Sequence, residues 1–206
     1  MLKRIVLRMM VLVIVLGSGA MIASAQLAQA LVPWLSVVTR NLDRTFRVES
    51  FQVENEGGEA IFRTRLGLAR PLTVDGRTYL PDARGQALSS TPVSNLLVPA
   101  VVLLSMAFAV PGCNSLDYLC RAALLLPALI LIGSFGVPLI LLGNLWRLVT
   151  ESVAPDRFSP LVAGADFLLN GGQTALAVAL AVVIVTVSHR FCRPRSAENQ
   201  SARLAP

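Results

Sequence analysis

The sequence predicts an α-helical membrane protein with about four transmembrane helices and a small extracytoplasmic β-meander inserted between the first and second helices. Its 206 residues are 54% hydrophobic and only 15% charged, whereas a soluble domain carries about 25% charged residues. The apolar residues gather in four charge-free blocks, each long enough to supply the roughly 20 helical residues that cross a bilayer. No block alternates like a barrel strand, which favours helices as the spanning form. The blocks lie between Arg8 and Arg40, Arg84 and Asp117, Arg121 and Arg147, and Asp166 and His189.

Residues 1–39 are expected to form an N-terminal signal anchor and the first transmembrane helix. A short basic start precedes an apolar run from Met9 to Val38. Ala23–Ala25 is similar to a signal-peptidase site, so cleavage after Ala25 is one alternative. The apolar run continues past this site, which favours an uncleaved anchor. Because the run exceeds one span by about ten residues, we expect the helix to project beyond the bilayer, with a kink at Pro33 and Trp34 at headgroup level.

Residues 40–92 are predicted to form an extracytoplasmic β-rich domain, because they hold fifteen of the thirty charged residues of the chain. Phe46–Glu54 alternates between apolar and polar residues with one break around Ser50, and Ala60–Leu68 reads as a second strand. Asp75-Gly76 is a short hairpin signal between two further strand-like segments. About fifty residues bury little apolar surface by themselves, so this domain is expected to pack against the membrane or a partner.

Residues 93–189 are predicted to hold transmembrane helices 2–4. Ser89–Pro92 would open the second span, with Thr91 or Ser94 as its cap, and Pro111-Gly112 would end it. A short polar turn, Cys113–Arg121, would join it to a third span from Ala122 to about Leu145. The third span contains prolines and glycines, which predict a kinked and closely packed helix, with a functional hinge as the alternative. These residues are Pro127, Gly133, Gly136, Pro138 and Gly143.

The fourth predicted span opens at Asn170–Thr174 and ends near His189, and residues 190–206 form a basic tail that we expect to be cytoplasmic and disordered. Four spans place both termini on one side. Counting basic residues does not decide which side, because 8 lie on one side and 10 on the other. Two observations favour termini on the cytoplasmic side. The basic-then-apolar start resembles a secretory signal, and in this orientation all three cysteines (Cys113, Cys120 and Cys192) would face the reducing cytoplasm. We therefore expect a multi-pass protein of the bacterial inner (cytoplasmic) membrane with both termini cytoplasmic.

The sequence contains no recognisable catalytic, cofactor-binding or metal-binding motif. The ionisable residues next to the spans (Asp117, Asp166 and His189) lie at span edges, where solvation costs little. One histidine is too few for a metal site. Asp166 is interpreted as an interfacial helix cap, with a proton-carrying carboxylate as the alternative. Cys120 is interpreted as an inert thiol, although the neighbouring Arg121 could activate it. Nucleic-acid binding is disfavoured because 17 of the 18 basic residues are arginines scattered over the loops.

Two apolar segments and the general layout support a family resemblance. The segments are Thr91–Pro99, which leads into a span, and Phe135–Gly143. An amino-terminal anchor, a short extracytoplasmic β-rich segment and a cluster of later spans resemble the small bacterial inner-membrane proteins encoded beside exosortases. The resemblance implies an accessory role near a protein-sorting enzyme. The sorting enzymes use membrane-embedded Cys, Arg and His motifs, and no position of this chain matches them.

The sequence therefore predicts a non-catalytic integral membrane accessory or scaffold protein of the cell envelope. Its partners would be the lipid bilayer and another membrane protein, such as a sorting enzyme, but not nucleic acid. We expect edge-strand pairing through Phe46–Glu54 or Ala60–Leu68. Close helix packing on the partner would use Gly133, Gly136 and Gly143. Two alternatives stay open: a small transporter or channel subunit, and a membrane enzyme using Cys120 or His189.

Overall fold

The computed structural model describes residues 2–74, 77–82, 85–112, 114–153 and 158–192. The helices are α1 (Leu2–Ile22), α2 (Ser24–Leu42), α3 (Ser94–Ala109), α4 (Ser115–Val153), α5 (Pro160–Phe167) and α6 (Gln173–Cys192). The segment η1 (Leu168–Gly172) joins α5 to α6 and contains a kink, because Asn170 and Gly171 leave helical geometry. The strands are β1 (Phe46–Glu56), β2 (Glu59–Leu68), β3 (Leu72–Val74), β4 (Arg77–Tyr79) and β5 (Gln86–Pro92). The prediction of a mainly helical chain with a small sheet is confirmed.

Within the described residues, three segments are long and apolar enough to cross a membrane, so the prediction of four spans is confirmed only in part. They are Lys3–Ile22, Ser115–Ser152 and Pro160–Arg190. The helix that corresponds to the second predicted span, α3, is apolar but has only 16 residues. Its predicted cap is also absent, because the residue before the helix is Val93 and no side chain caps its first amides. Ser94 Oγ instead donates a 2.8 Å hydrogen bond to Glu59 Oε1.

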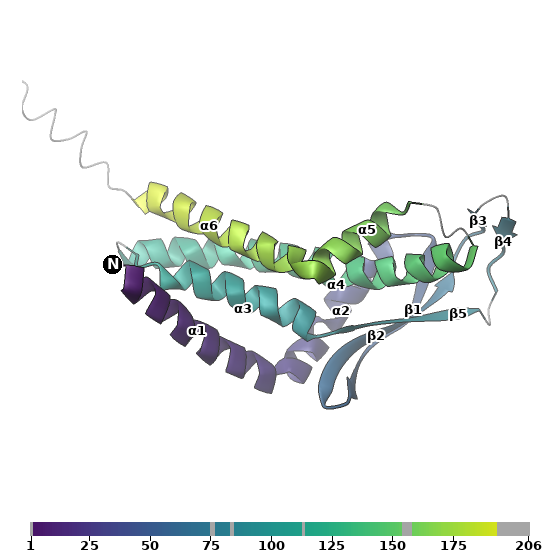
Figure 1. Cartoon of the computed structure of the whole chain (residues 1–206), viewed down its shortest axis with the longest axis horizontal. Coiled ribbons are helices and arrows are strands. Elements are labelled where there is room, and N and C mark those ends of the chain that lie inside the picture. Colours follow the sequence, from purple (N-terminus) through teal and green to yellow (C-terminus); the bar gives the residue numbers. More distant parts are fainter. Residues whose placement is uncertain (1, 75–76, 83–84, 113, 154–157, 193–206) are drawn as a thin grey trace, which may run out of the picture.

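The molecule has two parts that share the long helix α4 (Figure 1). A bundle of α1, α3, α6 and the first part of α4 forms one end, and the sheet with α2, α5 and the last part of α4 forms the other. The start of α1, the connection from α3 to α4 and the end of α6 lie together at the end of the bundle far from the sheet. We call this the terminal end of the bundle.

The main sheet has the order β1-β2-β5, with both pairs antiparallel. The register shifts between Val48 and Ser50, which matches the break in alternation seen in the sequence. Phe62 and Leu66 of β2 are almost fully buried beneath α2 and α4. The ring of Phe46 meets that of Trp146 of α4 edge-on, with centroids 5.6 Å apart. The sheet is therefore fastened to α4 through an apolar core.

The third strand of this sheet is β5. The two short strands that were predicted to continue the meander, β3 and β4, are not part of it. Ser89–Pro92, which was expected to open a helix, belongs to β5 and pairs with Ile61–Thr64 of β2. Ser89 Oγ donates a 2.9 Å hydrogen bond to the carbonyl of Leu141 in α4, which holds the strand on the helix. β3 and β4 form a separate two-stranded sheet, and their predicted turn, Asp75-Gly76, lies outside the described residues.

The long amino-terminal run forms two helices that meet at an elbow. The backbone leaves helical geometry at Ala23, with φ −93° and ψ 7°, while α2 continues through Pro33. The interruption at Ala23 was not predicted, and the predicted kink position, Pro33, lies inside α2 without ending it. Ile22 at the elbow is 88% exposed. The segment similar to a signal-peptidase site forms this elbow and the start of α2.

Helix α4 begins at Ser115 and ends at Val153, well beyond the predicted span on both sides. Asp117 and Arg121, which were assigned to a polar turn, lie inside its first two turns, where they pair with each other one helical turn apart. Pro127 and Pro138 are contained within the helix. The predicted disordered tail and Cys113 lie outside the described residues, apart from the tail's first residues at the end of α6.

The glycines of α4 pack inside the molecule, contrary to the expectation that they face a partner. A Cβ added at Gly133 would contact Leu96 of α3 at 3.5 Å. One at Gly136 would collide with Gln173 of α6, and one at Gly143 with Ala165 of α5. These glycines allow the close approach of three neighbouring helices of the same chain.

Candidate functional site

The first candidate is a cluster of buried polar residues at the terminal end of the bundle. Asp117 and Arg121 of α4 are both fully buried. Arg121 Nη2 lies 2.9 Å from Asp117 Oδ2, and Arg121 Nε donates to Asp117 Oδ1 at 3.2 Å. Arg121 Nε also donates to Ser188 Oγ of α6 at 3.2 Å. The pair therefore joins α4 to α6 in a region where a lone charge would be costly.

Arg121 also closes the carboxyl end of α3. Its Nη1 donates to the carbonyl oxygens of Ala107 at 2.9 Å and Val110 at 2.5 Å. These carbonyls belong to the last turn of α3 and to the residue after it, where the helix supplies no further N–H partners. A cation at this position also complements the helix dipole. One guanidinium thus binds three helices together.

His189 completes the cluster from α6 and is 35% exposed at its side chain. Its Nε2 lies 3.3 Å from Arg121 Nη2, and its Nδ1 lies 3.6 Å from Asp117 Oδ2. The expectation that Asp117 and His189 both sit at solvated edges is wrong for Asp117. Tyr118 packs beside the cluster, with the guanidinium carbon of Arg121 5.5 Å from its ring centroid. The arrangement suits a structural clamp, because the donors of Arg121 are all engaged.

The other residues singled out in the sequence lie apart from any recognisable reaction centre. Cys120 is a half-buried free thiol on α4. Asp166 lies near the carboxyl end of α5 and forms an ion pair with Arg147 of α4, so it is not an amino-terminal cap. The side chain of Cys192 is not among those described. Within the described ranges, no group of three or more His, Cys, Asp or Glu side chains could hold a metal ion.

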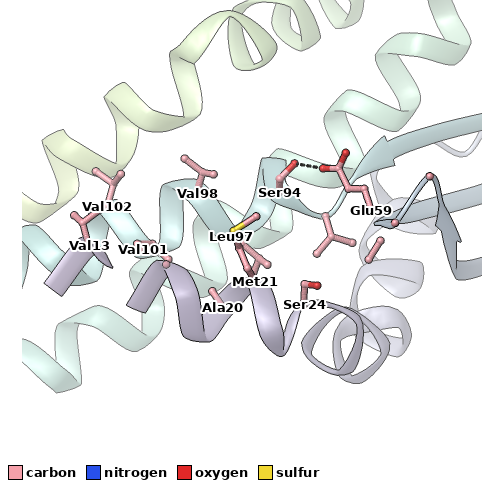
Figure 2. Close-up of a pocket in the computed structure, with 15 residues that line it drawn as sticks. Val13, Ala20, Met21, Ser24, Glu59, Ser94, Leu97, Val98, Val101 and Val102 are labelled. Carbon is pink, nitrogen blue, oxygen red and sulfur yellow. Dashed lines mark hydrogen bonds between the residues drawn. The ribbon is translucent and has the colours of Figure 1, made fainter. Parts of the chain in front are cut away.

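The second candidate is a groove between α1 and α3 with a volume of about 630 Å³. We call it the hairpin groove, because the turn between β1 and β2 closes one end. Figure 2 shows Glu59, Ser94 and Ser24 toward that end, and Val13 and Val102 toward the other. Pockets for apolar ligands commonly combine an apolar lining with a few polar groups at one place. The sequence does not reveal this groove, because its walls come from three separate segments.

A neighbouring groove of about 700 Å³, the elbow groove, lies between the α1–α2 elbow and helices α3 and α4. Its lining is almost wholly apolar. At its edge, Trp34 Nε1 of α2 donates a 3.2 Å hydrogen bond to Ser134 Oγ of α4. This hydrogen bond links α2 to α4 of the bundle. The expectation that Trp34 lies at headgroup level stays a prediction.

The outer face of the sheet carries ion pairs. Arg47 pairs with Glu49 at 2.8 Å. Arg63 pairs with Glu54 and, at 2.7 Å, with Glu56. Among the described strands, β1 pairs with β2 alone, so its other edge has no strand partner. This charged face and open edge are typical of a solvated sheet surface.

No protein-family model, no curated protein and no solved structure matches this chain.

Proposed function

We propose that this protein is a non-catalytic accessory protein of the bacterial inner membrane, with both termini cytoplasmic. In this proposal α1, α3, the first part of α4 and α6 cross the bilayer, and the sheet stands at the opposite surface as a docking platform for a partner. The partner we propose is a membrane-embedded sorting enzyme of the exosortase type, which is suggested by the layout resemblance alone. Three long apolar helices are compatible with membrane insertion.

The observation that carries the proposal is the continuity of α4 from the bundle into the sheet domain. Its 39 residues, at about 1.5 Å each, make a helix about 58 Å long. The hydrocarbon layer is about 30 Å thick, so about 28 Å of helix extends beyond it. Ser89 and Trp146 bind the sheet to this overhang. A sheet held at a fixed height above the bundle is suited to presenting a surface to a neighbour.

Short helix α3 fits the same membrane placement. Its 16 residues make only about 24 Å of helix. In hydrocarbon, each unsatisfied backbone carbonyl would cost several kcal/mol. Arg121 satisfies the carbonyls of Ala107 and Val110 at the end of α3, so this end tolerates a position near the membrane boundary.

The docking element that we propose is the open edge of β1. A partner segment could add to this edge as a further strand, using backbone hydrogen bonds for affinity. Of the two strands suggested by the sequence, only Phe46–Glu54 remains available, because Ala60–Leu68 lies in the central strand β2. The charges of β1 would then select the register and the partner.

A photo-crosslinking amino acid at Gln52 tests this proposal in native membranes. Gln52 lies on β1 and is exposed. Leu88 on β5 is 52% exposed and serves as the matched control position. We expect a discrete heavier adduct from Gln52 and none from Leu88, with an envelope protein identified by mass spectrometry. Equal adducts at both positions, or none at Gln52, would contradict the docking element.

Purified protein in sealed vesicles provides a second readout. An accessory protein should not increase ion or solute permeability above that of protein-free vesicles. A saturable flux would replace the accessory proposal with the transporter alternative.

A further inference from the structure

The hairpin groove is graded in polarity along its length. Glu59 and Ser94 form the polar end and are joined by a 2.8 Å hydrogen bond (Figure 2). The aliphatic part of the lining comes mainly from α1 and α3. This gradient matches an amphiphile whose head lies at the β1–β2 turn and whose apolar part lies along the helices.

The length of the groove distinguishes a lipid tail from a partner helix. Within α1, the lining runs from Val13 to Met21, eight residues apart, so the α1 wall is about 12 Å long. Along α3, Ser94 to Val102 covers about 12 Å. Half of the roughly 30 Å hydrocarbon layer is about 15 Å, which is the depth of one leaflet. A transmembrane helix of a partner would need a surface about twice as long.

Charge at the polar end indicates the kind of head that would bind. Glu59 is exposed at the mouth, and its carboxylate accepts the Ser94 hydrogen bond. Near the turn of the hairpin, Glu54 and Glu56 share Arg63, so these three residues together with Glu59 carry three negative charges and one positive charge. An acidic mouth favours a head with a cationic N–H donor and disfavours a purely anionic head.

We propose that the hairpin groove binds one phospholipid with an ammonium headgroup, as in phosphatidylethanolamine, from the leaflet on the side of the sheet. The ammonium donates to Glu59, and one acyl chain lies between α1 and α3. This inference rests on the membrane placement proposed above and is independent of any protein partner.

Gly17 gives the groove its width and offers a precise way to close it. A Cβ added at Gly17 meets nothing within 4 Å, so the side chain of Gly17→Leu has room to start and would occupy the groove that Gly17 lines. Gly19 lines the elbow groove and has equally open surroundings, which makes Gly19→Leu the matched control. Both changes replace a helix-disfavouring residue by a helix former, so neither is expected to weaken α1.

The test uses the full chain in vesicles of phosphatidylethanolamine and phosphatidylglycerol that contain a trace of either lipid with a photoactivatable acyl chain. We expect the ethanolamine probe to label Met21 or Val98 preferentially, and the label to be lost in Gly17→Leu but kept in Gly19→Leu. Equal labelling by the two probes, or unchanged labelling in Gly17→Leu, would overturn the proposal.

Glu59→Gln gives a second readout on the exposed head site, where misfolding is not a concern. Native mass spectrometry of the detergent-purified protein should show a roughly two- to fivefold weaker retention of phosphatidylethanolamine, the range expected for an exposed ion pair. Glu151→Gln makes the same charge change at an exposed side chain of α4 that does not line the groove, and it should retain the lipid. Equal losses in the two variants would refute a specific contact at Glu59. Failure of this test together with normal crosslinking at Gln52 would reject the lipid site alone.

Discussion

Asp117 and Arg121 lie one turn apart on α4 with both side chains fully buried, and the closest approach of their charged atoms is 2.9 Å. Arg121 extends from this pair to the end of α3 and to Ser188 of α6. A buried ion pair adds little stability compared with apolar residues, but a broken one is strongly destabilising. The pair therefore stabilises one arrangement of α3, α4 and α6, and we call it a lock in this sense.

Asp117→Asn should lower the free energy of unfolding by about 3–5 kcal/mol, because it leaves the buried Arg121 without its carboxylate. Denaturant unfolding in detergent micelles measures the change. The control is Glu56→Gln, which removes the largely exposed carboxylate that pairs with Arg63 and should cost at most about 1 kcal/mol. Similar small losses for both variants would show that the buried pair is not a lock.

Arg121→Lys should not restore the stability lost in Arg121→Met. The guanidinium reaches Asp117, Ser188 and the end of α3 simultaneously with a planar fork, whereas an ammonium group has three donors on a single atom. Thermal unfolding of the three proteins in one detergent makes the comparison. Recovery to the wild-type melting temperature in Arg121→Lys would mean that charge alone matters.

Gly143→Ala should destabilise the isolated protein by about 1–3 kcal/mol, the usual cost of overpacking. The new Cβ would meet Ala165 of α5 and come within 3.0 Å of the Leu161 carbonyl, and neither group can rotate away. Gly19→Ala, which enters open space, is the control and should be neutral or slightly stabilising. If Gly143→Ala is as stable as wild type but no longer co-purifies with a partner, the glycine faces that partner after all.

Trp146→Ala should loosen the sheet from α4. The indole packs on Phe46, and its Nε1 donates a 2.8 Å hydrogen bond to Asp43 Oδ2. Because Trp146 is only partly buried, we expect a loss of about 2 kcal/mol, less than the roughly 3–5 kcal/mol of a fully buried tryptophan. Limited proteolysis should show faster cleavage within β1–β5 in Trp146→Ala than in the wild type, and an intermediate cleavage rate in Trp146→Phe. Unchanged cleavage in Trp146→Ala would contradict the proposed rigid attachment.

Thiol labelling in intact cells tests the orientation in the membrane. In a chain whose three cysteines are replaced by alanine, a membrane-impermeant maleimide should label Gln52→Cys on the sheet before permeabilisation. It should label Leu116→Cys, at the terminal end and 65% exposed, only afterwards. The reverse order would invert the topology, and labelling of both from outside would exclude spanning helices between them.

Sequence patterns predicted the elements whose environment is set locally. The charge-free blocks mark the long helices, and the alternation of Phe46–Glu54, with its break at Ser50, predicts β1 together with its register shift. Strand β5 was missed because its polar Ser89 and Thr91 are buried through pairing with β2 and contact with α4. Such burial depends on distant residues and leaves no periodic signal.

The buried cluster was missed for a similar reason. An Asp and an Arg four residues apart usually form an exposed pair on a helix surface, so the spacing of Asp117 and Arg121 alone does not indicate burial. The deciding neighbour is Ser188, 67 positions further along the chain than Arg121. The roles of Gly136 and Gly143 were also ambiguous, because a small residue indicates close approach without saying which helix approaches.

Because α4 is long, a small tilt of the bundle would move the end of α4 that carries the sheet by a much larger distance. A helix bundle responds to a thinner or thicker bilayer by tilting. In the membrane placement proposed above, about 28 Å of α4 extends beyond the hydrocarbon, and a tilt of about 10° would move its far end sideways by about 5 Å. That distance exceeds the spacing of two neighbouring strands, about 4.8 Å, so changes in lipid composition could bring the β1 edge into or out of register with a fixed neighbour.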